Sequence, residues 1–315
     1  MSNSSLRHRA PRVIFFGMQG RFSPPSLHAL LAGGIDVRAV VLPSSSNAGA
    51  AIFRHEPFRP VRPLLPVVHS SLHVNVLQLA GEWQLPVWEV NNLSAPETLE
   101  TLAVYEPDVI CVACFSQRIP RAVLSLPRFG CLNVHPSLLP VNRGPVPLFW
   151  TFREGADHTG VTIHFMEETL DSGDILAQEV IPVPDGITYT QLETLCATQG
   201  GKLLADCVRD LTLGRAQRVP QDEGRSSYHP YPSGEDFVIP AAEWSARHVY
   251  NFICGVAEWG EAITLLAGNE RFTVQRAISY SHEEKSGGHR GQEEAYYRED
   301  DMLWVRCNEG WVSVI

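Results

Sequence analysis

Short apolar runs alternate with helix-length segments from residue 12 to residue 212, and this alternation constrains the fold more than any other feature of the sequence. The runs Arg12–Gly17, Asp36–Leu42 and Asp108–Phe115 are rich in apolar and β-branched residues and are too short for ordinary helices. Such runs are typical of strands buried on both faces, as in a parallel sheet covered by helices. The pattern predicts an α/β fold with a mostly parallel sheet and helices on both faces.

The N-terminal part of this pattern has the order strand, turn, helix, strand. After the first strand, Gly17–Gly20 is a predicted turn and Ser26–Ala32 a predicted helix, which indicates a Rossmann-like opening. The turn lacks the full G-x-G-x-x-G spacing, so we do not predict a dinucleotide site there. Further helices are expected at about 73–82, 95–104, 120–125, 147–153 and 188–212, with strands at 86–90, 108–115, 130–135, 160–166 and 175–182.

The last third of the chain has a different composition. Residues 215–236 are polar and contain several prolines and glycines, which is typical of a linker. A helix is predicted from Ala241 to Val256, followed by short strands at 262–266, 272–277, 303–307 and 311–315, a pattern that favours a small β-barrel. The predicted organisation is a disordered tail (1–11), a catalytic domain (12–214), a linker (215–236) and a C-terminal domain (237–315).

Composition and charge narrow the class of protein. The chain has 315 residues, of which 44% are hydrophobic, and a net charge of −10, which disfavours a protein that coats nucleic acid. The apolar runs are shorter than the roughly 20 residues of a membrane span, and the N-terminus lacks the apolar core of a signal peptide. The chain has seven cysteines, an odd number that cannot all be paired within one chain, and most of them lie in apolar segments. This pattern predicts reduced thiols in a cytoplasmic protein. The spacing Cys111-x-x-Cys114 has no second cysteine pair or histidine pair to support it, so no metal is predicted.

One long loop stands out at residues 43–70. It contains Arg54, Arg59 and Arg62 interleaved with Phe53 and Phe58. This combination suits either a phosphate and a stacked ring, or a solvated insertion packed by its own prolines, and the sequence leaves both open.

The motif with the most chemical content is Asn133-Val-His135-Pro-Ser-Leu-Leu-Pro140, followed by Leu170-Asp171-Ser-Gly-Asp174. On a strand, positions i and i+2 point to the same face, so Asn133 and His135 are expected to share one cleft. Asp171 lies on a later turn, from which it can orient the imidazole. An amide donor, a proton-transfer group and an orienting carboxylate together indicate acyl-type transfer. His164, in the strand between these motifs, is interpreted as structural.

These motifs, with Arg143-Gly144, Thr159-Gly-Val-Thr162 and Leu170-Asp-x-Gly-Asp-Ile-Leu176 in the same order, resemble the folate-dependent formyltransferases over residues 12–212. The C-terminal part is similar to the OB-like domain of the methionyl-tRNA formyltransferase branch, on the weaker evidence of Pro240–Trp244 and the helix with Tyr250.

The resemblance implies 10-formyltetrahydrofolate as the formyl donor and an amine as the acceptor. It implies that Asn133, His135 and Asp171 are catalytic. The residues expected to line the pteridine pocket are Phe115, Gln117, Arg118, Ile119 and Leu170. The residues expected to contact the acceptor are Arg54, Arg59, Arg62, Arg143 and Gly144.

The identity of the acceptor stays open between a small or nucleotide-sugar amine and methionyl-tRNA. A tRNA acceptor needs a basic surface, whereas the chain is acidic and its C-terminal arginines are scattered. Two other functions use the same residues. Water can replace the amine, which gives a 10-formyltetrahydrofolate hydrolase, and a non-catalytic folate-binding protein is the third alternative.

Overall fold

The computed structural model describes residues 9–44, 49–55, 75–282 and 294–315. Most of the predicted tail, residues 1–8, lies outside the described residues. Backbone packing divides the chain into two units, each assembled from separate stretches. The first unit comprises Met1–Val141, Gly160–Glu179 and Thr194–Ser226, and the second comprises Asn142–Thr159, Val180–Glu193 and Ser227–Ile315.

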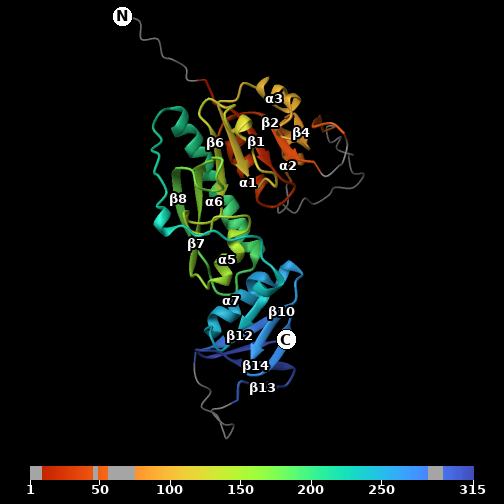
Figure 1. The fold of residues 1–315 in the computed structure, drawn as a ribbon, viewed down its shortest axis with the longest axis vertical. Helices are drawn as coiled ribbons and strands as arrows, with labels where there is room; N and C mark the ends of the chain where they lie inside the picture. The colour runs from red at the N-terminus through yellow and green to blue at the C-terminus, as the bar shows by residue number, and fades with distance from the viewer. Residues whose placement is uncertain (1–8, 45–48, 56–74, 283–293) are drawn as a thin grey trace, which may run out of the picture. The chain divides into compact units, whose positions relative to one another are not determined.

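The first unit is built on a sheet of eight strands in the order β3-β4-β2-β1-β5-β6-β7-β8 (Figure 1). The strands are β1 (Arg12–Gly17), β2 (Asp36–Pro43), β3 (Ile52–Arg54), β4 (Val87–Val90), β5 (Val109–Ala113), β6 (Cys131–His135), β7 (His158–Phe165) and β8 (Ile175–Pro182). Pairings β4-β2, β2-β1, β1-β5 and β5-β6 are parallel, whereas β3-β4 and β6-β7 are antiparallel. The predicted mostly parallel sheet is confirmed.

Helices cover both faces of this sheet, as predicted. They are α1 (Ser23–Ala32), α2 (Val76–Glu82), α3 (Pro96–Ala103), α4 (Arg121–Leu124) and α6 (Tyr189–Thr212). On one face, Leu102 of α3 and Val123 of α4 share a buried cluster with Ile110 of β5. On the other face, α6 lies so close to β6 that a Cβ at Gly200 would sit 2.5 Å from Val134 Cγ1. No helix in the described part of the chain is both long and apolar enough to cross a membrane.

The region predicted as a loop at 43–70 contains a short strand, which corrects the expectation. Residues Ile52–Arg54 form β3 and pair antiparallel with β4, with Ile52 opposite Val90. Burial falls along the strand from buried Ile52 to exposed Arg54, and three residues are too few to show a strand period in sequence. Residues 45–48 and 56–74, and with them Arg59 and Arg62, lie outside the described residues.

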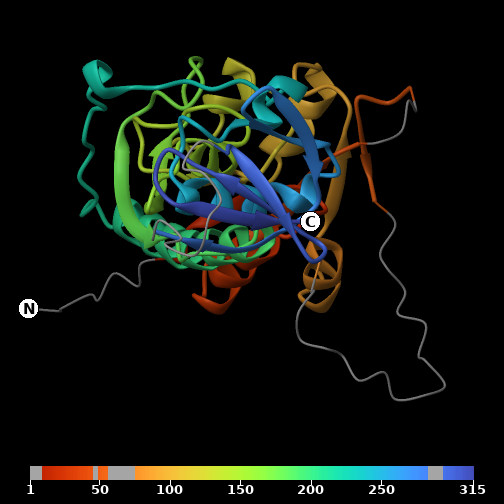
Figure 2. The ribbon, with the colours of Figure 1, turned by 90° about the horizontal axis from the view of Figure 1, so that it is seen from below.

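The second unit holds the C-terminal strands, where the sequence predicted a small β-barrel, and a small C-terminal region of β-sheet is present (Figure 2, blue). Its helices are α5 (Pro147–Arg153) and α7 (Ala246–Val256), with 3-10 turns at Gly234–Phe237 and Ala257–Trp259. Its strands are β9 (Val238–Pro240), β10 (Ile263–Ala267), β11 (Glu270–Val274), β12 (Ala277–Ser281), β13 (Tyr296–Glu299), β14 (Met302–Arg306) and β15 (Trp311–Val314). Among the described residues, these strands form two sheets, β11-β10-β9 and β12-β15-β14-β13.

Two boundaries in this unit differ from the predicted ones. The helix expected from Ala241 begins at Ala246, because the Ser245 Oγ accepts a hydrogen bond from the His248 N–H at 3.2 Å and caps the helix there. The strand expected at 272–277 is divided into β11 and β12. The break falls at Gln275, whose N–H donates to the Ile315 carbonyl at 2.8 Å and turns the chain toward the second sheet.

Candidate active site

Strand β6 carries Asn133 and His135 at its carboxyl end, the edge at which ligands bind in parallel sheets. Asn133 lies opposite Val112 of β5 in the parallel pairing and opposite His164 of β7 in the antiparallel pairing. Thus β6 is the strand at which the sheet changes direction. His135 is almost fully enclosed, with 4% of its surface exposed.

Asp171 reaches the same place from the loop between β7 and β8. Its Oδ1 lies 3.8 Å from His135 Nδ1 and 3.7 Å from His164 Nε2. Both distances exceed the roughly 3.2 Å limit of a direct hydrogen bond, so the carboxylate lies near both rings without bonding directly to either through these atoms. The backbone of Asp171 is left-handed, with φ of 52°, a conformation that aspartate tolerates better than most residues. The structure therefore brings the three predicted residues together.

His164 belongs to this cluster, which its interpretation as a structural strand residue missed. Its Nε2 lies 3.2 Å from Asn133 Nδ2, and its Nδ1 lies 2.8 Å from the carbonyl oxygen of Phe165. A carbonyl only accepts hydrogen bonds, so we assign the proton to Nδ1, and Nε2 of the neutral ring accepts from the Asn133 amide. His164 thereby sets the direction in which that amide points. The sequence gives no signal of this contact, which depends on the β6-β7 register.

The loop that carries Asp171 is held tightly by its surroundings. The N–H of Phe165 donates to the Asp174 carbonyl at 2.9 Å. A Cβ on Gly173 would lie 2.0 Å from the Phe165 carbonyl oxygen, so the close approach of these backbones requires glycine. The Gln221 side chain, from the segment predicted as a linker, donates from Nε2 to the carbonyls of Asp171 and Gly173, both at 2.8 Å.

The predicted pteridine residues lie in the same unit as these groups. Gln117 donates from Nε2 to the Val90 carbonyl at 2.9 Å, and Arg118 donates from Nη2 to the Glu168 carbonyl at 2.8 Å. The second bond joins the segment that contains Phe115 and Ile119 to the segment that ends at Leu170. Phe115 packs edge-on against Phe16 and Ile119 is buried, whereas Leu170 is 51% exposed beside Asp171.

The predicted acceptor residues in the described part of the chain belong to two different units. Arg54 is exposed on β3. Arg143 belongs to the second unit and is buried there, and its backbone bonds to the Ser227 carbonyl and the His229 N–H, both at 2.9 Å. Gly144 has a φ of 120°, and a Cβ there would lie 2.1 Å from the His229 carbonyl oxygen. Positions 143 and 144 are thus packed against residues 227–229.

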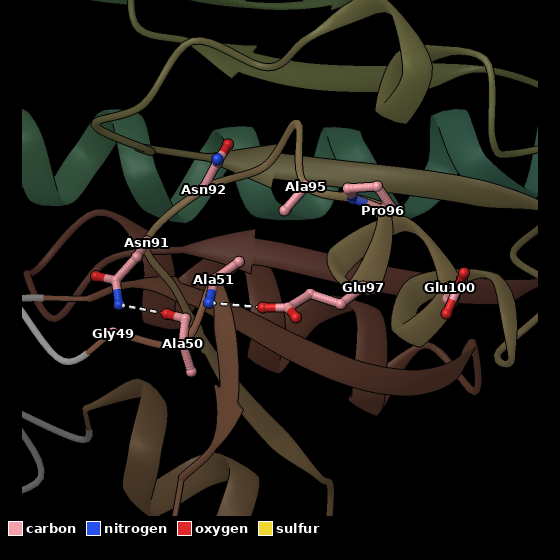
Figure 3. Close-up of a pocket in the computed structure, with 9 residues that line it drawn as sticks. All are labelled: Gly49, Ala50, Ala51, Asn91, Asn92, Ala95, Pro96, Glu97 and Glu100. Carbon is pink, nitrogen blue, oxygen red and sulfur yellow. Dashed lines mark hydrogen bonds between the residues drawn. The ribbon is translucent and has the colours of Figure 1, made fainter.

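A cavity of about 580 Å³ lies at the carboxyl end of β4 (Figure 3). Two hydrogen bonds join its walls, from Asn91 Nδ2 to the Ala50 carbonyl and from the Ala51 N–H to Glu97 Oε1. Its remaining lining residues are Gly49, Asn92, Ala95, Pro96 and Glu100. Strands β2, β1 and β5 separate β4 from β6, which corresponds to about 19 Å at about 4.8 Å per spacing. This cavity is separate from the Asn133 cluster.

Cys111 on β5 and Cys131 on β6 are buried near the site. Burial raises the pKa of the Cys111 thiol well above its usual value and that of Cys131 to about 12. Cys111 and Cys114 are not bonded to each other, and Cys114 is exposed. The described residues contain no group of three or more His, Cys, Asp or Glu side chains arranged to hold a metal ion.

Comparison with known protein families shows the family to which this chain belongs. Residues 11–208 match the model described as formyl transferase, and residues 233–315 match the model of the formyl transferase C-terminal domain. The chain belongs to the formyl transferase family. This formyl transferase is 36% identical to the methionyl-tRNA formyltransferase of Syntrophus aciditrophicus over 81% of its own length and 76% of the relative. It is 35% identical to that of Moorella thermoacetica over 84% and 79%.

Solved structures agree with the fold of this formyl transferase. The sugar 3N-formyl transferase WlaRD, solved with dTDP and 5-N-formyl-THF, has a TM-score of 0.65 at 13% identity and covers 97% of both chains. The N-formyltransferase of Helicobacter canadensis, in complex with folinic acid and dTDP-3-aminofucose, has a TM-score of 0.61 at 12% identity, over 96% of this chain and 97% of that one. These likenesses extend the shared architecture across nearly the whole chain.

Proposed function

We propose that this enzyme transfers the formyl group of 10-formyltetrahydrofolate to a primary amine. The observation that carries the proposal is the cluster of side chains at the carboxyl end of β6. Asp171 lies within 4 Å of both His135 and His164, and His164 lies within 4 Å of Asn133. The folate donor is further supported by the family and by the formyl-folate named with the WlaRD structure.

In the first step the amine nitrogen attacks the formyl carbon, and the carbonyl oxygen becomes an oxyanion. The Asn133 amide has two hydrogens, one of which is directed at His164 Nε2. The second is the donor that we assign to the oxyanion. A preorganised donor of this kind typically lowers the barrier by about 2.7–4 kcal/mol.

In the second step the bond between the formyl carbon and N10 of the folate breaks. The attacking amine loses a proton and N10 gains one, so the reaction needs a group that moves protons. His135 turns Nδ1 toward Asp171, and we assign the transfer to Nε2 on the other side of the ring. Asp171 stabilises the imidazolium that forms while the proton is held.

The segment of Phe115 to Ile119 and the Leu170 side chain support a pteridine site beside this chemistry. The half-exposed Leu170 offers an apolar surface next to Asp171, which a flat ring can cover. Main-chain groups of the 115–119 segment are suited to the donors and acceptors on the ring edge.

For the acceptor, we propose methionyl-tRNA first, because the similar curated relatives carry that name and both family models match. One observation favours a small amine on a nucleotide sugar instead. The net charge is −10, and only Lys202 and Lys285 are lysines, so a basic surface for tRNA has to be built from arginines.

The test is transfer of labelled formyl from 10-formyltetrahydrofolate to a panel of acceptors that includes charged initiator tRNA, uncharged tRNA and nucleotide-linked amino sugars. Formylated methionyl-tRNA, formed with a rate that falls steeply with salt, supports the first acceptor. Formylated sugar supports the second. Formate release that no acceptor accelerates identifies a hydrolase. Asp171→Ala is the matched inactive variant, and wild-type turnover in it refutes the assigned site.

A further inference from the structure

The segment that follows α6 contacts the end of β7, the start of β8 and the loop between them, although its composition is typical of a linker. The Arg218 guanidinium lies 3.8 Å above the centre of the Phe165 ring. Val219 and Ile175 exchange two backbone hydrogen bonds, at 2.8 and 2.9 Å. Gln221 then donates from one amide nitrogen to the carbonyls of Asp171 and Gly173.

The two carbonyls that Gln221 binds belong to the residues on either side of Ser172. A side-chain amide nitrogen has two hydrogens, so a single Gln221 group serves both acceptors at 2.8 Å each. Binding both at once fixes the direction of the peptide planes around Ser172. One of these residues is Asp171, whose left-handed φ of 52° is intrinsically unfavourable for a residue with a side chain.

We propose that Gln221 is a positioning residue for catalysis, which fastens the 171–173 backbone and so aims the Asp171 carboxylate at His135. The proposal rests on the proposed function, because it gives Gln221 a role in the same site. Without the two hydrogen bonds, the backbone at Asp171 samples its more favourable right-handed and extended conformations. The carboxylate then spends less time near His135 Nδ1, where it lies at 3.8 Å.

The proposed role of Gln221 depends on the hydrogen bonds that its amide donates. Substitutions can therefore distinguish it from a role in which the side chain only fills space. Gln221→Glu keeps the shape of the side chain but replaces the donor with a carboxylate, which repels the two carbonyl oxygens. Gln221→Ala removes the donor and the bulk together. Gln217→Ala is the matched control, because Gln217 is an exposed glutamine in the same segment. A packing role predicts that the glutamate variant behaves like wild type.

The experiment uses the full chain and has two arms. The first measures kcat and KM with 10-formyltetrahydrofolate and the acceptor found active with wild type. The expected result is a fall in kcat of about tenfold to hundredfold in both Gln221 variants, with KM for the folate changed by less than about threefold. The second arm measures amide hydrogen exchange in residues 169–175. Exchange there is expected to rise by about tenfold in both variants, the factor that corresponds to about 1.4 kcal/mol.

The exchange arm does not use the reaction, so it decides the fastening role even when no acceptor is turned over. Wild-type enzyme that transfers no formyl group contradicts the proposed function and leaves that arm intact. Unchanged exchange in both variants overturns the positioning role. So does a Gln221→Glu enzyme with wild-type kcat, or a Gln217→Ala enzyme that loses as much activity as Gln221→Ala.

Discussion

Replacing Gly173 with alanine tests whether catalysis depends on the close packing of the loop between β7 and β8, which carries Asp171. The added Cβ would lie 2.0 Å from the Phe165 carbonyl oxygen, whereas ordinary van der Waals contact begins at 3.4 Å. Either the loop or the end of β7 therefore has to move by about 1.4 Å. Both carry groups of the site, since Asp171 lies two residues before Gly173 and His164 directly precedes Phe165.

Two consequences follow from a displacement of this size. Overpacking of a closely fitted backbone costs about 1–3 kcal/mol in stability. Misplacing a catalytic group by about 1 Å costs about a hundredfold in rate. We expect Gly173→Ala to fold, to unfold at a lower temperature, and to show a kcat reduced by about a hundredfold.

The assay is steady-state formyl transfer, together with thermal unfolding followed by circular dichroism. Gly81→Ala is the control, because Gly81 lies in α2 with no atom within 4 Å of the added Cβ. Alanine at that helical position is expected to stabilise the protein by about 0.5–1 kcal/mol and to leave turnover unchanged. A Gly173→Ala enzyme with wild-type kcat would refute the reasoning.

Three further predictions concern single side chains. Asn133→Ala is expected to lower kcat by about 10²–10³ with little change in KM, measured in the same assay, and a change confined to KM contradicts its oxyanion role. His164→Leu removes the acceptor of the Asn133 amide and is expected to lower both kcat and the free energy of unfolding, the latter by about 1–3 kcal/mol. The pKa of Asp185 is raised by burial but lowered more by hydrogen bonds from Tyr280, Asn251 and Arg247, so it lies below its usual value. Its stabilisation is therefore present above about pH 4 and lost as the pH falls further, and the difference in Tm between wild type and Asp185→Asn is expected to shrink below that pH.

The central sheet could be predicted from sequence because its strands carry their own signal. All five residues of β5 are buried. A short, continuous apolar run between helical segments is typical of a strand in a parallel sheet. The two-residue spacing of Asn133 and His135 likewise predicted a shared face without knowledge of the fold. These features depend on local order along the chain.

The residues of the candidate site that the sequence did not predict are brought there by contacts between distant segments. His164 meets Asn133 through the antiparallel register of β6 and β7, and Gln221 meets Asp171 across 50 positions. Nothing in the polar composition of 215–236 distinguishes Gln221 from its exposed neighbours. The late start of α7 has a different cause. The residues just before Ser245 are compatible with a helix, but the Ser245 side chain caps the helix and so fixes its first residue at Ala246.

The position of β6 between a parallel and an antiparallel neighbour has a consequence for how length variation can be tolerated. Asn133 faces His164 because β7 is paired in one frame, with Ile163 opposite Val134 and Phe165 opposite Leu132. A single residue inserted or deleted inside β7 slips that frame, puts an apolar neighbour opposite Asn133 and turns the imidazole to the other side of the sheet. The ladder pairs that set this frame do not include residues of the connection from 136 to 157. A change of length within β7 therefore separates the amide–imidazole pair directly, whereas a change in the connection does not shift the ladder pairs themselves.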